Sequence, residues 1–246
     1  MALFVLVHGM FHGGWCWERI RAPLERVGHT GVAPDLAGCG DDRTPSTDVS
    51  LDVWAASIAT IANEAPEKVI LVGHGRGGVV VSQAAEMASD KVAAIVYLAA
   101  LLLPDGKAAT DLAEIMEAQG YEVGSMIVPR ISDDGQYVLP PEGGMRLSYG
   151  RCKSYIRRWA FENMGREPIA PMVTPISVTS QNWGRLPKIY IEATKDRLLT
   201  IDAQRAMIAA VRPDEVITMD TDHMSLITDV PELTVVLDGI AGRYVA

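Results

Sequence analysis

The stretch that decides the fold is Lys68-Val69-Ile70-Leu71-Val72-Gly73-His74-Gly75-Arg76-Gly77-Gly78-Val79-Val80-Val81. An apolar run of strand length leads into a cluster of glycines, and an apolar segment of helix length follows. This order is typical of the G-x-S-x-G nucleophile elbow, a sharp strand-to-helix turn that presents one side chain above a parallel sheet. The central residue here is Gly75, so the motif becomes G-H-G-R-G and has no side-chain nucleophile.

A glycine-rich turn between a strand and a helix has a second interpretation, because such turns also hold phosphate at a helix N-terminus. The segment lacks the Lys-Ser/Thr pair of a P-loop. Its glycine spacing also differs from the G-x-G-x-x-G of dinucleotide-binding folds. Taken alone, the motif leaves both interpretations open, and segments elsewhere in the chain decide between them.

Strand-like and helix-like segments alternate along most of the chain, which predicts a mainly parallel sheet with helices on both faces, an α/β fold. The strand candidates are continuous apolar runs, as expected for strands covered on both sides. They occupy residues 3–7, 31–34, 68–72, 93–98, 188–192 and 215–219. The helix candidates occupy residues 15–27, 51–64, 76–88, 202–211 and 231–244.

This alternation stops between residues 104 and 186, where glycine, proline, methionine and aromatic residues dominate. Helical pieces are expected near 111–119 and 144–163 within it. The segment is too long for an ordinary loop, and strand 188–192 follows it directly. We therefore predict a core of residues 1–103 and 187–246 with an inserted lid over 104–186, which closes a pocket and selects its ligand.

Three further segments carry the residues expected around the elbow. The loop after the first strand begins His8-Gly9-Met10, the kind of loop that supplies one amide of an oxyanion hole. The second amide is that of the residue after the nucleophile position, so Met10 and Arg76 are the predicted donors. Asp196 and His223 follow two successive strands, in the chain order of nucleophile, acid and base.

Together these segments resemble the plant methylesterase and hydroxynitrile lyase family of α/β-hydrolases and its bacterial esterase relatives. The matching pieces are H-G-M-F-H-G-G-W-C-W at 8–17, P-D-L-A-G-C-G-D-D at 34–42, G-H-G-R-G-G at 73–78, I-Y-I-E-A-T-K-D-R at 189–197 and D-H-M-S-L at 222–226. The family's serine corresponds to Gly75. The hydroxynitrile lyases have a threonine in the first loop and a lysine after the histidine, where this chain has Gly9 and Met224. The resemblance therefore implies the esterase branch.

In a serine-bearing form, the resemblance implies a Ser-His-Asp hydrolase of a small, largely apolar carboxylic ester. Three interpretations of Gly75 remain open. The first is an esterase altered at this position and inactive or nearly so. The second is a lyase or cyclase that uses the Asp196–His223 pair as a general base without a nucleophile. The third is a non-catalytic small-molecule-binding homologue. The retained acid and base argue against the third interpretation, because a site that only binds a ligand does not need a general base.

Several other residues have competing roles. Asp222 is an alternative acid to Asp196, and Ser82 is an alternative nucleophile that we expect in the core. His8, His29 and His74 are expected to be structural. The predicted substrate pocket includes His12, Tyr121, Tyr149, Trp159, Trp183 and Met224.

Composition limits the partners. A net charge of -9 argues against nucleic acid and anionic membranes. The three cysteines, Cys16, Cys39 and Cys152, have no metal or redox spacing and fit a reducing cytoplasm. The apolar run 3–7 is too short for a signal peptide and has no basic segment before it. We expect a cytoplasmic protein with a small ester or related ligand and no metal or organic cofactor; a homodimer is left open.

Overall fold

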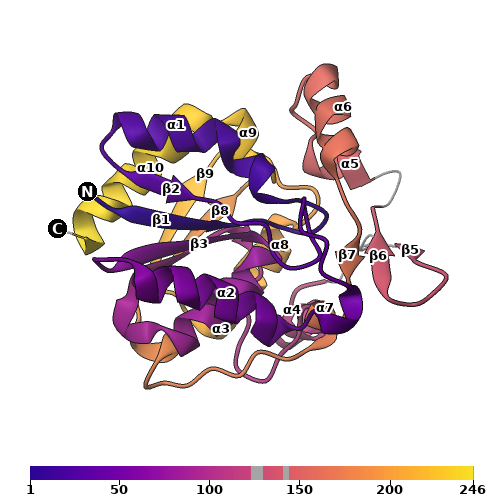
Figure 1. Ribbon diagram of the computed structural model, residues 1–246, viewed down its shortest axis with the longest axis horizontal. Helices are drawn as coiled ribbons and strands as arrows, with labels where there is room; N and C mark the ends of the chain where they lie inside the picture. The colour runs from indigo at the N-terminus through magenta and orange to yellow at the C-terminus, as the bar shows by residue number, and fades with distance from the viewer. Residues whose placement is uncertain (123–129, 141–143, 246) are drawn as a thin grey trace.

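The computed structural model describes residues 1–122, 130–140 and 144–245 (Figure 1). Its centre is a six-stranded sheet in the order β2-β1-β3-β4-β8-β9, with every neighbouring pair parallel. This confirms the predicted parallel α/β architecture. The strands are β1 (Leu3–Val7), β2 (Thr30–Val32), β3 (Val69–Gly75), β4 (Val92–Ala100), β8 (Lys188–Ala193) and β9 (Glu215–Met219).

Helices cover both faces of this sheet (Figure 1). One face carries α1 (Glu18–Arg26), α9 (Ser225–Thr228) and α10 (Val230–Tyr244), and the other carries α2 (Leu51–Glu64), α3 (Gly77–Met87) and α8 (Ile201–Val211). The side chains of β1 alternate between the two cores, because successive residues of a strand point to opposite faces. Phe4 and Leu6 join the core under α1 and α10, while Val5 and Val7 join the core under α2 and α3. Short 3-10 helices lie at Gly14–Trp17, Ser46–Asp48 and Ser89–Lys91.

The segment between β4 and β8 forms a cap. It contains a second, three-stranded antiparallel sheet, which the sequence did not predict. Its elements are the 3-10 helix Ala109–Asp111, α4 (Leu112–Ala118), β5 (Arg130–Ile131), β6 (Tyr137–Leu139), α5 (Gly144–Ser148), α6 (Ser154–Asn163), β7 (Glu167–Pro168), α7 (Ala170–Val173) and the 3-10 helix Trp183–Arg185. Figure 1 shows α5, α6 and the small sheet at one end of the molecule, away from the helices that cover the large sheet.

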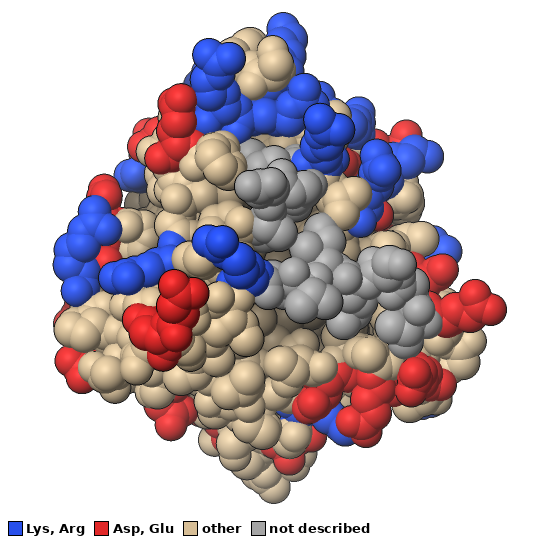
Figure 2. All heavy atoms as spheres, turned by 90° about the vertical axis from the view of Figure 1, so that its right-hand side faces the viewer, with Lys and Arg blue, Asp and Glu red and all other residues tan. Residues whose placement is uncertain are grey.

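The helical structure expected near 144–163 consists of two helices, α5 and α6. The chain turns between them because this turn is anchored to the core. The Tyr149 hydroxyl bonds to His12, and the Arg151 amide donates to the Asp222 carboxylate at 3.0 Å. Figure 2 views the cap end and shows Lys and Arg side chains gathered over its upper part, where α6 lies.

Candidate active site

The elbow forms where β3 ends and α3 begins. Gly75 has a φ of +53°, in the left-handed region that glycine adopts without strain. A side-chain carbon at Gly73 would lie 2.7 Å from the carbonyl carbon of Gly77, so strand and helix approach this closely only with glycine at position 73. The local sequence therefore builds the sharp turn of a nucleophile elbow even though its central residue has no side chain.

The structure brings Gly75, His223 and Asp196 together. A Cβ atom at Gly75 would lie 3.4 Å from Nε2 of His223, within ordinary contact distance. Nδ1 of His223 is 2.7 Å from Oδ2 of Asp196, and both side chains are buried. Oδ1 of Asp196 accepts the Leu198 and Leu199 amides at 2.8 and 2.9 Å. The Asp196 carboxylate is thus held by the backbone, and the imidazole of His223 is directed at Gly75.

The alternative acid and the alternative nucleophile are bonded elsewhere. Asp222 is buried, and its carboxylate accepts the Arg151 and Met224 amides and the Thr228 hydroxyl. Ser82 is fully buried, where its hydroxyl donates to the Gly78 carbonyl and bonds to the Tyr97 hydroxyl. Neither has a recorded contact with the imidazole of His223, which agrees with their expected structural roles.

The three histidines expected to be structural each hold backbone in place. Nε2 of His74 donates to the His223 carbonyl at 2.9 Å, so this residue fixes the backbone of the candidate base. His8 accepts the Leu36 amide, and His29 accepts the Ala2 amide. Burial lowers the pKa of both His8 and His74 well below the usual value, so these two rings are neutral at pH 7.

The two residues predicted as oxyanion donors lie in different segments, Met10 in the loop after β1 and Arg76 between β3 and α3. In the part of the chain that the structure describes, the amides of Met10 and Arg76 donate to no other group. His12 fixes this loop, because its Nδ1 lies 2.5 Å from the Met10 carbonyl, which can only accept. Nε2 of His12 must then accept from the Tyr149 hydroxyl, also at 2.5 Å. Burial lowers the pKa of His12 to about 4, in keeping with this neutral tautomer.

A buried carboxylate from the cap completes the arrangement. Glu167 of β7 is fully buried, and its Oε2 accepts the Phe11 amide at 3.0 Å. Its Oε1 lies 2.7 Å from Nε of Arg76, whose guanidinium also stacks over Trp54 at 4.2 Å. The Gly165 amide donates to the Phe11 carbonyl at 2.9 Å, so the cap holds both sides of a residue with a φ of +65°.

Sequence reasoning missed Glu167, and only an indirect signal pointed to it. Arg76 stands between the glycines of a buried elbow, and a buried arginine needs a carboxylate partner. The sequence therefore indicates that Arg76 needs an acidic partner. It does not indicate which acidic residue this is, because Glu167 lies 91 positions away along the chain.

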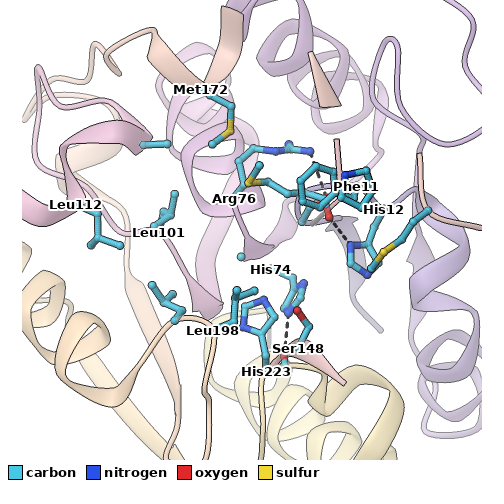
Figure 3. A pocket seen from close by; sticks show the side chains of 17 residues that line it. Phe11, His12, His74, Arg76, Leu101, Leu112, Ser148, Met172, Leu198 and His223 are labelled. Atoms are coloured by element: carbon cyan, nitrogen blue, oxygen red, sulfur yellow. Dashed lines mark hydrogen bonds between the residues drawn. The ribbon is translucent and has the colours of Figure 1, made fainter. Parts of the chain in front are cut away.

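A cavity of about 210 Å³ lies over the elbow. Figure 3 shows His12, His74 and His223 toward one side of it and Leu101, Leu112 and Met172 toward the other. The lining residues are mostly apolar: Gly9, Met10, Phe11, His12, His74, Gly75, Arg76, Leu101, Ala109, Leu112, Pro140, Ser148, Met164, Met172, Leu198, Leu199 and His223. An apolar chamber with a few polar groups at one wall suits a small ligand with one polar end.

Of the six predicted pocket residues, only His12 lines this cavity. The structure places Tyr149 behind His12, Trp159 against Trp15, and Met224 in the core under α1 and α10. Trp183 donates to the Tyr97 hydroxyl on the opposite face of the sheet, and Tyr121 packs against the core on that face. The five predicted aromatic and methionine residues other than His12 thus lie outside the lining. The cap contributes leucine, methionine, alanine, proline and Ser148 to the cavity wall.

Residues 1–122, 130–140 and 144–245 contain no group of three or more His, Cys, Asp or Glu side chains that could hold a metal ion. None of their helices is long and apolar enough to cross a membrane.

A parallel sheet covered on both faces, an elbow and a buried His–Asp pair define a hydrolase of the α/β class. The chain belongs to the alpha/beta hydrolase family, whose model matches residues 4–236. It is 32% identical to methylesterase 7 of Arabidopsis thaliana over 255 residues, covering 98% of this chain and 96% of that protein.

Two further similarities define its neighbourhood. The chain is 30% identical over 238 residues to putative chloroplastic methylesterase 14 of Arabidopsis thaliana, and the match spans 89% of this chain and 66% of that longer protein. Its fold matches that of tomato methylketone synthase I, crystallised with 2-tridecanone, with a TM-score of 0.85 and 24% identity over 99% of this chain and 98% of the other. The homologues support an esterase-type hydrolase.

Proposed function

We propose that this site belongs to a carboxylesterase that acts on small, largely apolar esters, and that Gly75 leaves it without its nucleophile. The observation that carries the proposal is the 3.4 Å between Nε2 of His223 and the Cβ position of residue 75. A hydroxyl at that position would lie within reach of an imidazole already oriented by Asp196.

With a serine at position 75, acyl transfer would follow the usual two steps. His223 takes the hydroxyl proton as the oxygen attacks the ester carbonyl, and Asp196 stabilises the imidazolium that forms. The amides of Met10 and Arg76 donate to the oxyanion. His223 then gives its proton to the departing alkoxide, and a water activated by the same imidazole releases the acid.

Without that hydroxyl the covalent step is absent, while the acid, the base and the oxyanion donors remain. Loss of the serine alone costs about a millionfold in kcat in serine hydrolases. The unmodified chain is therefore expected to bind esters and to hydrolyse them at a rate close to that of the oxyanion hole alone.

The test compares the unmodified chain, Gly75→Ser and Gly75→Ala on a panel of activated aryl esters. We expect hydrolysis to rise by several orders of magnitude only in Gly75→Ser, and to fall again in Gly75→Ser/His223→Ala. Gly75→Ala is the matched control, because it adds a side-chain carbon without a hydroxyl. A correctly folded Gly75→Ser protein that stays as inactive as Gly75→Ala would overturn the proposal.

A second candidate is base catalysis without a nucleophile, and it is favoured by the open space at Gly75. Nε2 of His223 has no hydrogen-bond partner among the described residues, so its lone pair can reach a substrate proton. The fold neighbour crystallised with 2-tridecanone indicates that this fold also accommodates ketones. If this candidate is right, the unmodified chain exchanges the α-protons of a small ketone for deuterium, and His223→Gln does not.

A further inference from the structure

Two amide donors and a base border the position opposite His223. Nε2 of His223 faces Gly75, and the residue is only 5% exposed. Within the described parts of the chain this atom has no partner, and the Met10 and Arg76 amides are also unused. Arg76 precedes α3, an 11-residue helix whose N-terminus adds positive potential to this position.

An ester and a carboxylic acid meet these groups differently. The carbonyl oxygen of either can accept the two amides. An ester has neither a hydrogen to donate to Nε2 nor a negative charge to attract an N–H there. A bound ester would therefore displace water from Nε2 and leave this atom unpaired, which is costly. A carboxylate with one added proton pairs with Nε2 through its second oxygen, in a charge-assisted hydrogen bond. With Gly75, the polar groups of the site are therefore satisfied by an acid and not by an ester.

The charge of the cap gives an independent indication. Residues 146–166 contain six basic side chains and one acidic side chain, in a chain whose net charge is -9. Of the six, all but the half-buried Arg157 are exposed: Arg146, Arg151, Lys153, Arg157, Arg158 and Arg166. Figure 2 shows Lys and Arg side chains gathered at this end of the molecule. Because Ser148 and Met164 of the same segment line the cavity, this positive potential lies near the pocket and attracts anions.

We propose that the Gly75 chain binds a monocarboxylic acid with a short apolar tail, with the carboxyl group in the space left by the absent nucleophile. One carboxyl oxygen accepts the Met10 and Arg76 amides, and the other shares a proton with Nε2 of His223. The tail occupies the wall formed by Leu101, Leu112 and Met172. This inference uses the site of the proposed esterase and names the ligand class of the chain as it stands.

Binding must be accompanied by a proton. The other titratable groups around the imidazole do not supply one: Asp196 is its bonded partner, the neutral rings of His74 and His12 have pKa values lowered by burial, and Arg76 is paired with Glu167. A carboxylate that is ionised in solution therefore takes one proton from solvent on binding at alkaline pH. In that range its affinity falls about tenfold for each unit of pH.

The experiment is isothermal titration calorimetry of the unmodified chain with hexanoate, hexanamide and methyl hexanoate, which share one tail. We expect hexanoate to bind about tenfold or more tightly than either neutral compound at pH 6. We also expect its heat above pH 7 to vary with the ionisation enthalpy of the buffer, as uptake of a proton requires. Equal or weaker binding of hexanoate, no binding at millimolar concentration, or no buffer dependence would each overturn the proposal.

Two variants locate the effect. His223→Gln should remove the preference for hexanoate, and so should Gly75→Ser, whose hydroxyl would occupy Nε2; melting curves identify any variant that fails to fold. Preference retained in both folded variants would place the carboxylate elsewhere and refute the assignment. If Gly75→Ser hydrolyses esters but the unmodified chain shows no preference for hexanoate, the esterase proposal stands and the acid-binding proposal is refuted. If Gly75→Ser does not hydrolyse esters but the unmodified chain does prefer hexanoate, only the esterase proposal fails.

Discussion

Glu167→Ala should be among the most destabilising single substitutions in this chain. It removes the partner of a guanidinium whose side chain is 2% exposed and leaves the charge of Arg76 buried beside Trp54. Breaking one side of a buried ion pair costs about 3–5 kcal/mol. The lost acceptor for the Phe11 amide adds about 1–3 kcal/mol if no water replaces it. Solvent screening does not reduce these figures, because the Glu167 side chain is fully buried.

For a chain of this length, each kcal/mol lowers the melting temperature by about 2–4 °C, so the ion-pair loss alone predicts a drop of about 6–20 °C. Urea unfolding should show the same loss as a lower midpoint with an unchanged slope. Glu162→Ala is the matched control, because Glu162 is an exposed glutamate of the same cap. Its effect should stay within about 0.5 kcal/mol.

A thermodynamic cycle tests the cause. Arg76→Met/Glu167→Met removes both charges and should recover much of the stability that either single substitution loses, because no unpaired charge remains. A cost below about 1 kcal/mol for Glu167→Ala would match an exposed pair. That result would refute the reasoning, since it would mean that the guanidinium finds water or another acceptor when Glu167 is removed.

Three further predictions follow from the site. Gly75→Ser and Gly75→Ala should each lower stability in thermal unfolding by about 1–3 kcal/mol, because both place a side chain at a φ of +53°; an unchanged melting temperature would contradict the strain. Between pH 6.5 and about 4 the unfolded chain binds a proton at His12 that the folded chain does not. The free energy of unfolding, measured with urea, should therefore decrease as the pH is lowered through this range, by up to about 3 kcal/mol from His12. No such fall would mean that the ring is accessible. In the Gly75→Ser background, Asp196→Asn should lower kcat about ten-thousandfold. Asp222→Asn changes a side chain that accepts the Arg151 amide and should lower kcat far less. Similar losses in kcat for the two variants would contradict the assignment of Asp196 as the acid.

The core of the fold could be predicted because local sequence and tertiary environment agree there. The run 3–7 coincides with β1, a strand whose last four residues are buried, since an apolar stretch of that length suits a covered parallel strand. The run 215–219 coincides with β9, which is an edge strand with Val216 and Thr218 exposed, so its β-branched residues gave the signal and its burial did not. The helix expected over 51–64 matches α2, which starts after Ser50, whose hydroxyl accepts the Val53 amide. In each case the signal lies within a few residues.

The cap could not be predicted in the same way, because its conformation depends on distant partners. β7 has only two residues, Glu167 and Pro168, and it exists through pairing with Tyr137 and Val138. No local pattern marks such a strand. The same reason explains the misplaced pocket residues: an aromatic side chain in the cap can face the cavity or the core, and the choice depends on what it meets there. Tyr149 meets His12.

The geometry of the His–Asp pair does not depend on the residue at position 75. Asp196 is fixed by two backbone amides, and the backbone of His223 is fixed by His74. None of these contacts would involve a nucleophile. A change from serine to glycine at position 75 would therefore delete one reactant and leave the other groups in place, with Nε2 of His223 and the Met10 and Arg76 amides facing the cavity. On the proposal above, the ligand then decides how Nε2 is satisfied: an ester has no proton to give, whereas a carboxylate binds together with a proton taken from solvent.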